Sequence, residues 1–262
     1  MRISIVQNKP LFGDKAGNIR ALIEAMESAP SDLYVLPELA YSGYQFVSIQ
    51  EARELADDLD SPSIEEFRRA SKRLGACVIF GFPERAGDKL YNSSLALLPS
   101  GKSHLYRKTH LFYKEKLFFA PGDRGFSLFE YEGARIGLAI CFDWFFPESF
   151  RTLARKGADI VAHSSNLVMP YCQQADFAQA VQNRIYIATA NRVGSESRDG
   201  ETLSFTGGSV LLSPRGDYLL RGPAGEAAVL TADIDPSAAR NKTLNPYNDA
   251  LADRRPEFYL EG

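Results

Sequence analysis

Short apolar runs alternate with amphipathic segments along most of the chain. The apolar runs predict strands at residues 2–7, 33–36, 77–81, 90–98, 104–107, 135–140, 159–163, 188–193, 209–212 and 227–233. Helices are predicted at residues 17–27, 63–74, 147–157 and 173–185. In the first helix, Ile19, Leu22 and Met26 share one face, and the third begins at Pro147, which suits a first helical position, and stops at Gly157.

This alternation predicts an α/β fold. Strands that are apolar throughout are typical of sheets covered by helices, and the excess of strand over helix in the middle and the C-terminal third indicates antiparallel pairing as well. A layered α/β sandwich therefore fits better than a purely parallel nucleotide-binding sheet. The chain has no G-x-G-x-x-G motif, no Walker loop and no low-complexity linker, so we expect one domain over residues 1–262.

Composition narrows the class of protein. The 262 residues are 45% hydrophobic and 24% charged with a net charge of -3, which is ordinary for a soluble globular protein. Lys and Arg are scattered, so no nucleic-acid partner is expected. No apolar run approaches the ~20 residues of a membrane span, and the N-terminus lacks the pattern of a secretory signal. We therefore expect no membrane partner.

The cysteines and histidines give no sign of a metal or a disulfide. The cysteines are odd in number and widely spaced, without a C-x-x-C pair, which favours a reducing cytoplasm. The histidines are too dispersed to suggest a metal site. These residues are Cys77, Cys141, Cys172, His104, His110 and His163. We expect no cofactor and no metal.

Three polar residues stand where predicted strands end. Glu38 follows the strand at 33–36, Lys108 follows the strand at 104–107, and Cys141 follows the strand at 135–140. Ligands commonly bind at strand ends of open α/β folds. A carboxylate could take the thiol proton, and an ammonium could stabilise the oxyanion of a tetrahedral intermediate.

Each residue also has a simpler interpretation. Cys141 could be a small core residue, Glu38 a turn residue after Pro37, and Lys108 a solvated surface charge. A Cys–His mechanism that uses His110 or His163 is a further alternative, although a buried structural role suits either histidine.

Longer segments around these residues carry a family resemblance. Leu36-Pro37-Glu38-Leu39, Tyr106-Arg107-Lys108-Thr109-His110-Leu111 and Cys141-Phe142-Asp143-Trp144-Phe145-Phe146-Pro147-Glu148 resemble, in order and spacing, the signature blocks of the nitrilase superfamily of carbon–nitrogen hydrolases. Smaller matches at Tyr91-Asn92-Ser93 and Pro121-Gly122-Asp123 extend the resemblance. It implies a four-layer α-β-β-α sandwich and a homodimer or higher homo-oligomer, with a C-terminal tail of about residues 240–262 at the dimer interface.

The resemblance also implies roles. Glu38 corresponds to the general base, Cys141 to the nucleophile, and Lys108 with the Phe142 N–H to the oxyanion hole. Glu115 matches a second glutamate that holds the lysine, although a surface charge in a Lys-rich stretch is the alternative. The expected partner is a small amide or nitrile.

Aromatic residues suggest the kind of substrate. Several relatives that bind carboxylates carry an Arg shortly after the nucleophile, where this chain has Trp144 and Phe145. The expected pocket comprises Tyr44, Trp144, Phe145 and Asn166, with Tyr41 and Phe118 nearby, and would suit a neutral apolar acyl group or a cation. These rings could equally just pack the loop.

The reaction itself is open at this point. Typical nitrilases often have Trp directly after the cysteine, and Phe142 in that position favours an amide over a nitrile. Nitrile or N-carbamoyl hydrolysis and acyl transfer are alternatives, and so is a non-catalytic binding protein. A protein of that last kind usually loses at least one of the three catalytic residues.

Overall fold

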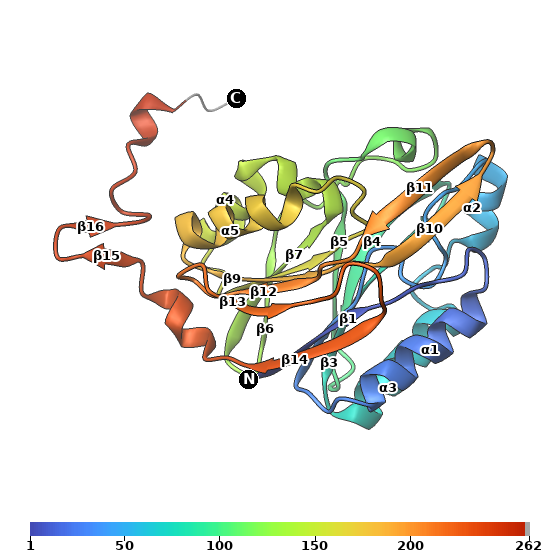
Figure 1. Cartoon of the computed structure of the whole chain (residues 1–262), viewed down its shortest axis with the longest axis horizontal. Coiled ribbons are helices and arrows are strands. Elements are labelled where there is room, and N and C mark those ends of the chain that lie inside the picture. Colours follow the sequence, from blue (N-terminus) through green and yellow to red (C-terminus); the bar gives the residue numbers. More distant parts are fainter. Residues whose placement is uncertain (260–262) are drawn as a thin grey trace.

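The computed structural model describes residues 1–259, which form two six-stranded sheets with helices outside them. Figure 1 shows α1 (Lys15–Glu27) and α3 (Pro62–Leu74) on one side of the sheets, and α4 (Pro147–Arg155) and α5 (Cys172–Asn183) on the other. The α-β-β-α sandwich implied by the resemblance is confirmed.

Each sheet has a parallel centre and antiparallel edges. The first runs in the order β14 (Ala228–Asp233), β1 (Arg2–Gln7), β2 (Leu33–Val35), β3 (Cys77–Ala86), β4 (Lys89–Leu97) and β5 (Ser103–Arg107). The second runs β13 (Tyr218–Arg221), β12 (Val210–Leu212), β9 (Tyr186–Ala190), β8 (Ile160–Ser164), β7 (Ala134–Ile140) and β6 (Leu128–Tyr131). Strands β1 to β3 pair in parallel, and so do strands β7 to β9. In each sheet the carboxyl ends of these three strands therefore lie at the same edge.

The core follows from side chains that alternate along each strand. Ile3, Ile5 and Leu33 lie in a buried cluster with residues of the second sheet such as Leu138, between the two sheets. Tyr34, one position on from Leu33, packs on the opposite face with residues of α1 and α3. A strand buried on both faces must be apolar throughout, which is the pattern seen in the sequence.

Several predicted boundaries needed correction. The strand predicted at 188–193 lies at 186–190, because Asn191 leaves the sheet and its side chain bonds Leu167 N and the Gly207 carbonyl. The chain then forms a hairpin that was not predicted, β10 (Val193–Arg198) and β11 (Glu201–Thr206). The helix predicted to residue 185 ends at Asn183, since Arg184 adopts a left-handed conformation. The short helix α2 (Ile49–Leu55) was also missed.

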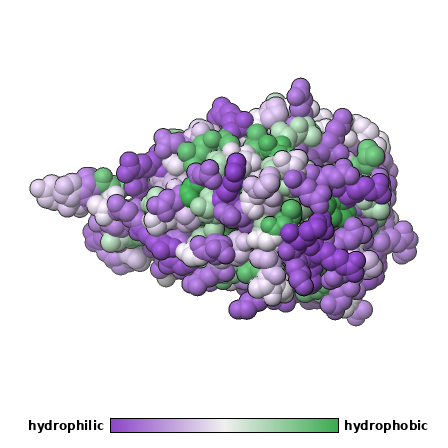
Figure 2. Space-filling model, turned by 90° about the horizontal axis from the view of Figure 1, so that it is seen from below, coloured by the Kyte–Doolittle hydropathy of each residue, from purple (hydrophilic) through white to green (hydrophobic). Residues whose placement is uncertain are grey.

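The C-terminal segment leaves the body after β14. It contains the 3-10 helices η3 (Pro236–Arg240) and η4 (Pro256–Phe258) and the small hairpin β15 (Thr243–Asn245) and β16 (Asn248–Asp249). Figure 1 shows β15 and β16 projecting from the sandwich, and the narrow projection at the left of the mainly hydrophilic face in Figure 2 is this segment. Residues 260–262 of the predicted tail lie outside the described part.

None of the helices within residues 1–259 is both long enough and apolar enough to cross a membrane.

Candidate active site

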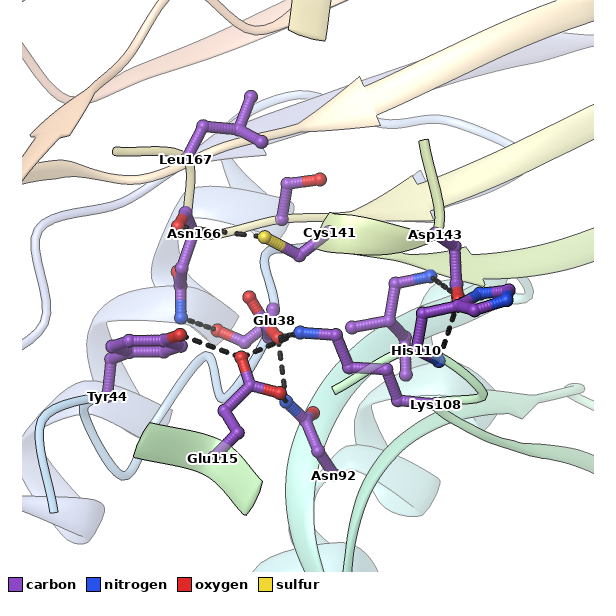
Figure 3. A network of polar contacts seen from close by, with 12 residues as sticks. Glu38, Tyr44, Asn92, Lys108, His110, Glu115, Cys141, Asp143, Asn166 and Leu167 are labelled. Atoms are coloured by element: carbon purple, nitrogen blue, oxygen red, sulfur yellow. Dashed lines mark hydrogen bonds and ion pairs between the residues drawn. The ribbon is translucent and has the colours of Figure 1, made fainter. Parts of the chain in front are cut away.

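Glu38, Lys108 and Cys141 come together from two different sheets (Figure 3). Glu38 lies just beyond β2 and Lys108 directly after β5, both in the first sheet, whereas Cys141 directly follows β7 of the second. All three are buried, with at most 5% of each residue exposed. The Lys108 ammonium lies 2.6 Å from Glu38 Oε1 and 2.7 Å from Glu115 Oε1. The four residues therefore occupy one buried polar site.

Two further side chains complete this polar network. Asn92 Nδ2 donates to Glu38 Oε1 at 2.6 Å, and the Tyr44 hydroxyl donates to Glu115 Oε1 at 2.7 Å. Tyr44 was predicted as a pocket residue, and the structure places its hydroxyl on Glu115. The role of Asn92 was missed, although it lies in the Tyr91-Asn92-Ser93 match. Glu115 is buried in the 3-10 helix η1 (Tyr113–Leu117), so the surface-charge alternative is wrong.

The two oxygens of Glu38 have different environments. Oε1 accepts from Lys108 and Asn92, whereas Oε2 is buried without a hydrogen-bond partner. An unpaired buried carboxylate oxygen is unfavourable, and it leaves Oε2 as the open acceptor position of Glu38. Gly81 allows β3 to pass close behind, since a Cβ there would lie 2.5 Å from Glu38 Cα.

Cys141 sits in a sharp turn that joins β7 to the 3-10 helix η2 (Cys141–Phe145). Its φ of 37° lies in the left-handed region, which residues with a Cβ rarely adopt. Asp143 helps to hold the turn by accepting from Ile140 N at 2.9 Å and from the Tyr106 hydroxyl at 2.7 Å. The Cys141 sulfur is directed to the Asn166 carbonyl oxygen, 3.7 Å away.

The electrostatics of the site favour a neutral thiol beside a charged ammonium. Burial and the charge of Glu38 raise the pKa of Cys141 well above its usual value, and the opposing effect of Lys108 is smaller. Burial alone would lower the pKa of Lys108, but the charges of Glu115 and Glu38 outweigh it and the pKa is raised. Nucleophilic attack by this thiol would therefore require transfer of its proton to a base.

Cys141 opens into a small cavity without charged side chains. Its lining residues are apolar apart from one amide and the thiol itself: Phe112, Cys141, Phe142, Trp144, Asn166, Leu167, Val168 and Met169. Tyr44, Glu115 and Phe118 line a second hollow. Trp144 and Asn166, both predicted as pocket residues, line the cavity at Cys141.

Phe145, predicted for the pocket, and Tyr41, expected near it, do not line these hollows. Phe145 is not a lining residue of either hollow; it is 55% exposed and stacks on Phe142, because the turn of η2 directs it outward. Tyr41 lies in the core between the first sheet and its helices, where it packs on Phe67 and bonds Asp57.

The histidines do not form a Cys–His pair. His110 Nδ1 lies 2.8 Å from Asp143 Oδ1, and its ring stacks on Phe146. His163 Nε2 lies 2.9 Å from the carbonyl oxygen of Cys141, not from its sulfur. Neither ring is placed to take the thiol proton.

One group within residues 1–259 combines three metal-ligating residue types. His163, Cys172 and Asp176 are fully buried, and their ligand atoms lie within 4.8 Å of one another. The dispersion of the histidines along the sequence therefore did not predict their surroundings in the fold. Hydrogen bonds already connect this group, since Asp176 Oδ2 accepts from the Thr189 hydroxyl at 2.6 Å and from the Cys172 thiol at 3.5 Å.

Comparisons with known proteins agree with the fold and the buried site. The model of the carbon-nitrogen hydrolase family matches residues 2–242, and the chain therefore belongs to this family, the nitrilase superfamily. It is 41% identical to a nitrilase of Pyrococcus abyssi, over 99% of both chains. It is 34% identical to an (R)-stereoselective amidase of Pseudomonas sp, over 97% of this chain and 92% of the relative.

A solved structure shows the same fold. The carbon-nitrogen hydrolase of Helicobacter pylori G27 superposes with a TM-score of 0.88 and 24% identity, over 99% of this chain and 96% of that one. The family match and the two sequence relatives show that the protein is a carbon–nitrogen hydrolase of the nitrilase or amidase type.

Proposed function

We propose that this enzyme hydrolyses a small amide with a neutral, apolar acyl group, through a thioester on Cys141. The observation that carries this proposal is the buried Glu38–Lys108–Glu115 network, which offers an unpartnered carboxylate oxygen and an ammonium at the point where the thiol lies. A non-catalytic binding protein would not need buried charges of this kind, whose desolvation costs several kcal/mol per ion.

The residues divide the acylation step between them. Glu38 Oε2 takes the thiol proton, and the sulfur attacks the amide carbon. The carbonyl oxygen becomes an oxyanion that accepts hydrogen bonds from Lys108 Nζ and the Phe142 N–H. Glu38 then returns the proton to the amide nitrogen, the C–N bond breaks, and ammonia leaves a thioester.

Deacylation uses the same groups in reverse. Glu38 takes a proton from water, and the hydroxide attacks the thioester carbon. The second oxyanion collapses, the C–S bond breaks, and the sulfur regains its proton as the carboxylic acid leaves. Glu115 holds Lys108 in place throughout, and Tyr44 in turn holds Glu115.

The cavity supports the choice of acyl group. Its aromatic and aliphatic lining has no charged side chain to pair with a charged substrate, and burial of charge without a partner is costly. The similarity to an (R)-stereoselective amidase and Phe142 in place of Trp after the nucleophile both favour an amide.

A nitrile is the second candidate, favoured by the 41% identity to a nitrilase. Attack of Cys141 on a nitrile carbon gives a thioimidate, which adds water and loses ammonia to give the same thioester. The first adduct therefore distinguishes the two substrates, and deacylation is shared.

A direct test measures ammonia release from a panel of matched compounds: butyramide, benzamide, butyronitrile, benzonitrile and N-carbamoyl-β-alanine. We expect amide turnover that Cys141→Ala abolishes and that Cys77→Ala, which removes a buried thiol from β3, retains. Full activity of Cys141→Ala would refute the mechanism. Turnover of nitriles without amides would refute the substrate class alone.

We further propose a homodimer in which the C-terminal segment packs on the partner subunit. This segment projects from the sandwich and exposes Leu244, Tyr247 and Phe258, and Tyr247 is 90% exposed. Light scattering should give the dimer mass for the wild type and a lower mass for a Leu244→Asp/Tyr247→Asp variant. A wild-type monomer would refute this proposal.

A further inference from the structure

His163 lies directly behind the nucleophile and is hydrogen-bonded on both sides of its ring. His163 is the fourth residue of β8 (Ile160–Ser164) and has no exposed surface. Nε2 lies 2.9 Å from the Cys141 carbonyl oxygen and 3.1 Å from Ser165 Oγ. Nδ1 lies 3.2 Å from Thr189 Oγ1 and 3.5 Å from Asp176 Oδ2.

These contacts determine the protonation of the ring. The closer partner of Nε2 is a carbonyl oxygen, which can only accept, and the Ser165 hydroxyl can accept as well, so Nε2 carries a proton. The Thr189 hydroxyl gives its single proton to Asp176 at 2.6 Å and therefore presents a lone pair to Nδ1, which must carry a proton too. With both nitrogens protonated, His163 is an imidazolium paired with the Asp176 carboxylate.

The pKa agrees with this geometry. Burial alone would lower the pKa of His163, but the charge of Asp176 and the hydrogen bonds to Asp176 and to the Cys141 carbonyl together raise it. The other ionisable groups around the ring are Cys172 on α5 and Cys141 and Asp143 on η2. Burial keeps both thiols protonated, so Asp176 is the anion in contact with the ring, and Asp143 acts from farther away.

The carbonyl that His163 contacts belongs to a particular peptide. The Cys141 C=O and the Phe142 N–H form one planar trans unit and point in opposite directions. A hydrogen bond that fixes the carbonyl therefore also fixes the direction of the N–H. Phe142 lies in the first turn of η2, where N–H groups have no partner within the helix. The φ of 37° at Cys141 is unfavourable in itself, so an outside contact is needed to hold this peptide.

We propose that His163 and Asp176 are positioning residues for the oxyanion hole: the imidazolium holds and polarises the Cys141–Phe142 peptide so that its N–H stabilises the oxyanion. This inference rests on the proposed function, because it takes the Phe142 N–H as an oxyanion donor. A donor on the carbonyl strengthens the hydrogen bond that the same peptide donates, and a charged donor does so more than a neutral one.

Two reactions of Cys141 distinguish an effect on the thiol from an effect on the oxyanion hole. Alkylation of Cys141 by iodoacetamide needs the thiol and its base but forms no oxyanion, whereas hydrolysis needs both. In His163→Gln, whose amide can still donate to the carbonyl but carries no charge, we expect kcat to fall about 10-fold with KM nearly unchanged. In His163→Ala, kcat should fall about 100-fold, as for a lost oxyanion donor. The alkylation rate should change less than about 2-fold in both variants.

The probes are butyramide with butyraldehyde, or benzamide with benzaldehyde if the wild type prefers it. The aldehyde forms a tetrahedral adduct with the thiol, so its affinity should fall by the same factor as kcat. His104→Gln, a change in a histidine that bonds Ser127, serves as the matched control and should keep both activities.

The pH profile gives a second readout that a purely structural role would not change. An imidazolium with a raised pKa is present at low pH and is lost as pH rises through that pKa. Asp176→Asn removes the charge that raises it, so the alkaline limb of kcat should move to lower pH. This variant keeps the shape of the side chain, and circular dichroism verifies its fold.

The outcomes distinguish this inference from the proposed function. A wild type that releases no ammonia from any compound of the panel would refute the proposed function. Given an active wild type, unchanged kcat in His163→Gln, or equal losses of hydrolysis and alkylation, would refute the role of His163. An unmoved alkaline limb in Asp176→Asn would refute the imidazolium.

Discussion

Removal of the buried ammonium tests the charge balance of the site. Lys108 is 1% exposed and contacts two carboxylates at 2.6 Å and 2.7 Å. At an effective dielectric of about 20, each contact corresponds to about 6 kcal/mol of Coulomb attraction, which offsets desolvation penalties of several kcal/mol per ion. In Lys108→Met the two carboxylates lose their counter-ion. We expect the free energy of unfolding to fall by about 3–5 kcal/mol at pH 8 and kcat to fall at least about 100-fold.

The loss of stability in this variant should depend on pH. Without the ammonium, Glu38 and Glu115 repel each other, and the pKa of Glu115, which burial already raises, should rise further. A carboxyl group whose folded pKa is raised contributes stability below its unfolded pKa and loses it as pH rises through the folded pKa. The stability deficit of the variant should therefore shrink by up to about 1.4 kcal/mol per pH unit as pH falls from 8 towards 5.

Urea unfolding followed by the fluorescence of Trp144, the single tryptophan, measures this effect. A double variant, Lys108→Met/Glu115→Gln, is the matched control, because it removes one of the two repelling charges while the Gln oxygen can still accept from Tyr44. We expect it to recover at least about 2 kcal/mol of stability at pH 8 without recovering activity. A deficit that does not vary with pH, or no recovery in the double variant, would refute the charge assignment.

Three further predictions concern the backbone, the cavity and the thiol. Gly81→Ala should lower the free energy of unfolding by about 1–3 kcal/mol and lower kcat, because its Cβ would lie 2.5 Å from Glu38 Cα. Gly225→Ala, whose Cβ would have no neighbour within 4 Å, is the control and should change neither quantity. Equal effects of the two substitutions would contradict the close approach at Gly81. Met169→Arg places a cation in the apolar lining, where it could pair with the carboxylate of succinamate. The ratio of kcat/KM for succinamate to kcat/KM for butyramide should rise about 10-fold. An unchanged ratio would show that Met169 does not face the acyl group. Alkylation of Cys141 by iodoacetamide should keep accelerating beyond pH 9, because burial and Glu38 raise its pKa above the ordinary value of 9.0; a plateau near neutral pH would indicate a preformed thiolate.

Periodicity and local chemistry determined the frame of this protein. Apolar runs flanked by amphipathic segments specify sheets covered by helices, because a strand buried on both faces admits few polar residues. Pro62 at the start of α3 and Gly75 in a left-handed conformation at its end are local signals of the same kind. The hairpin of β10 and β11 was missed because its strands are mainly polar, although Asp199-Gly200, with φ of 49° and 74°, is a local signal for a two-residue hairpin turn.

The signature blocks drew attention to Glu38, Lys108 and Cys141 as the proposed catalytic groups, but not to the environment in which they would act. Only the tertiary structure brings the ends of strands from two sheets to one point, removes those groups from water, and leaves Glu38 Oε2 without a hydrogen-bond partner. The proposed role of His163 and Asp176 likewise depends on the tertiary structure and not on the sequence around them. Nothing local distinguishes either from a core residue, because their protonation follows from hydrogen bonds between β8, β9, α5 and the nucleophile turn, and such contacts exist only once the chain has folded.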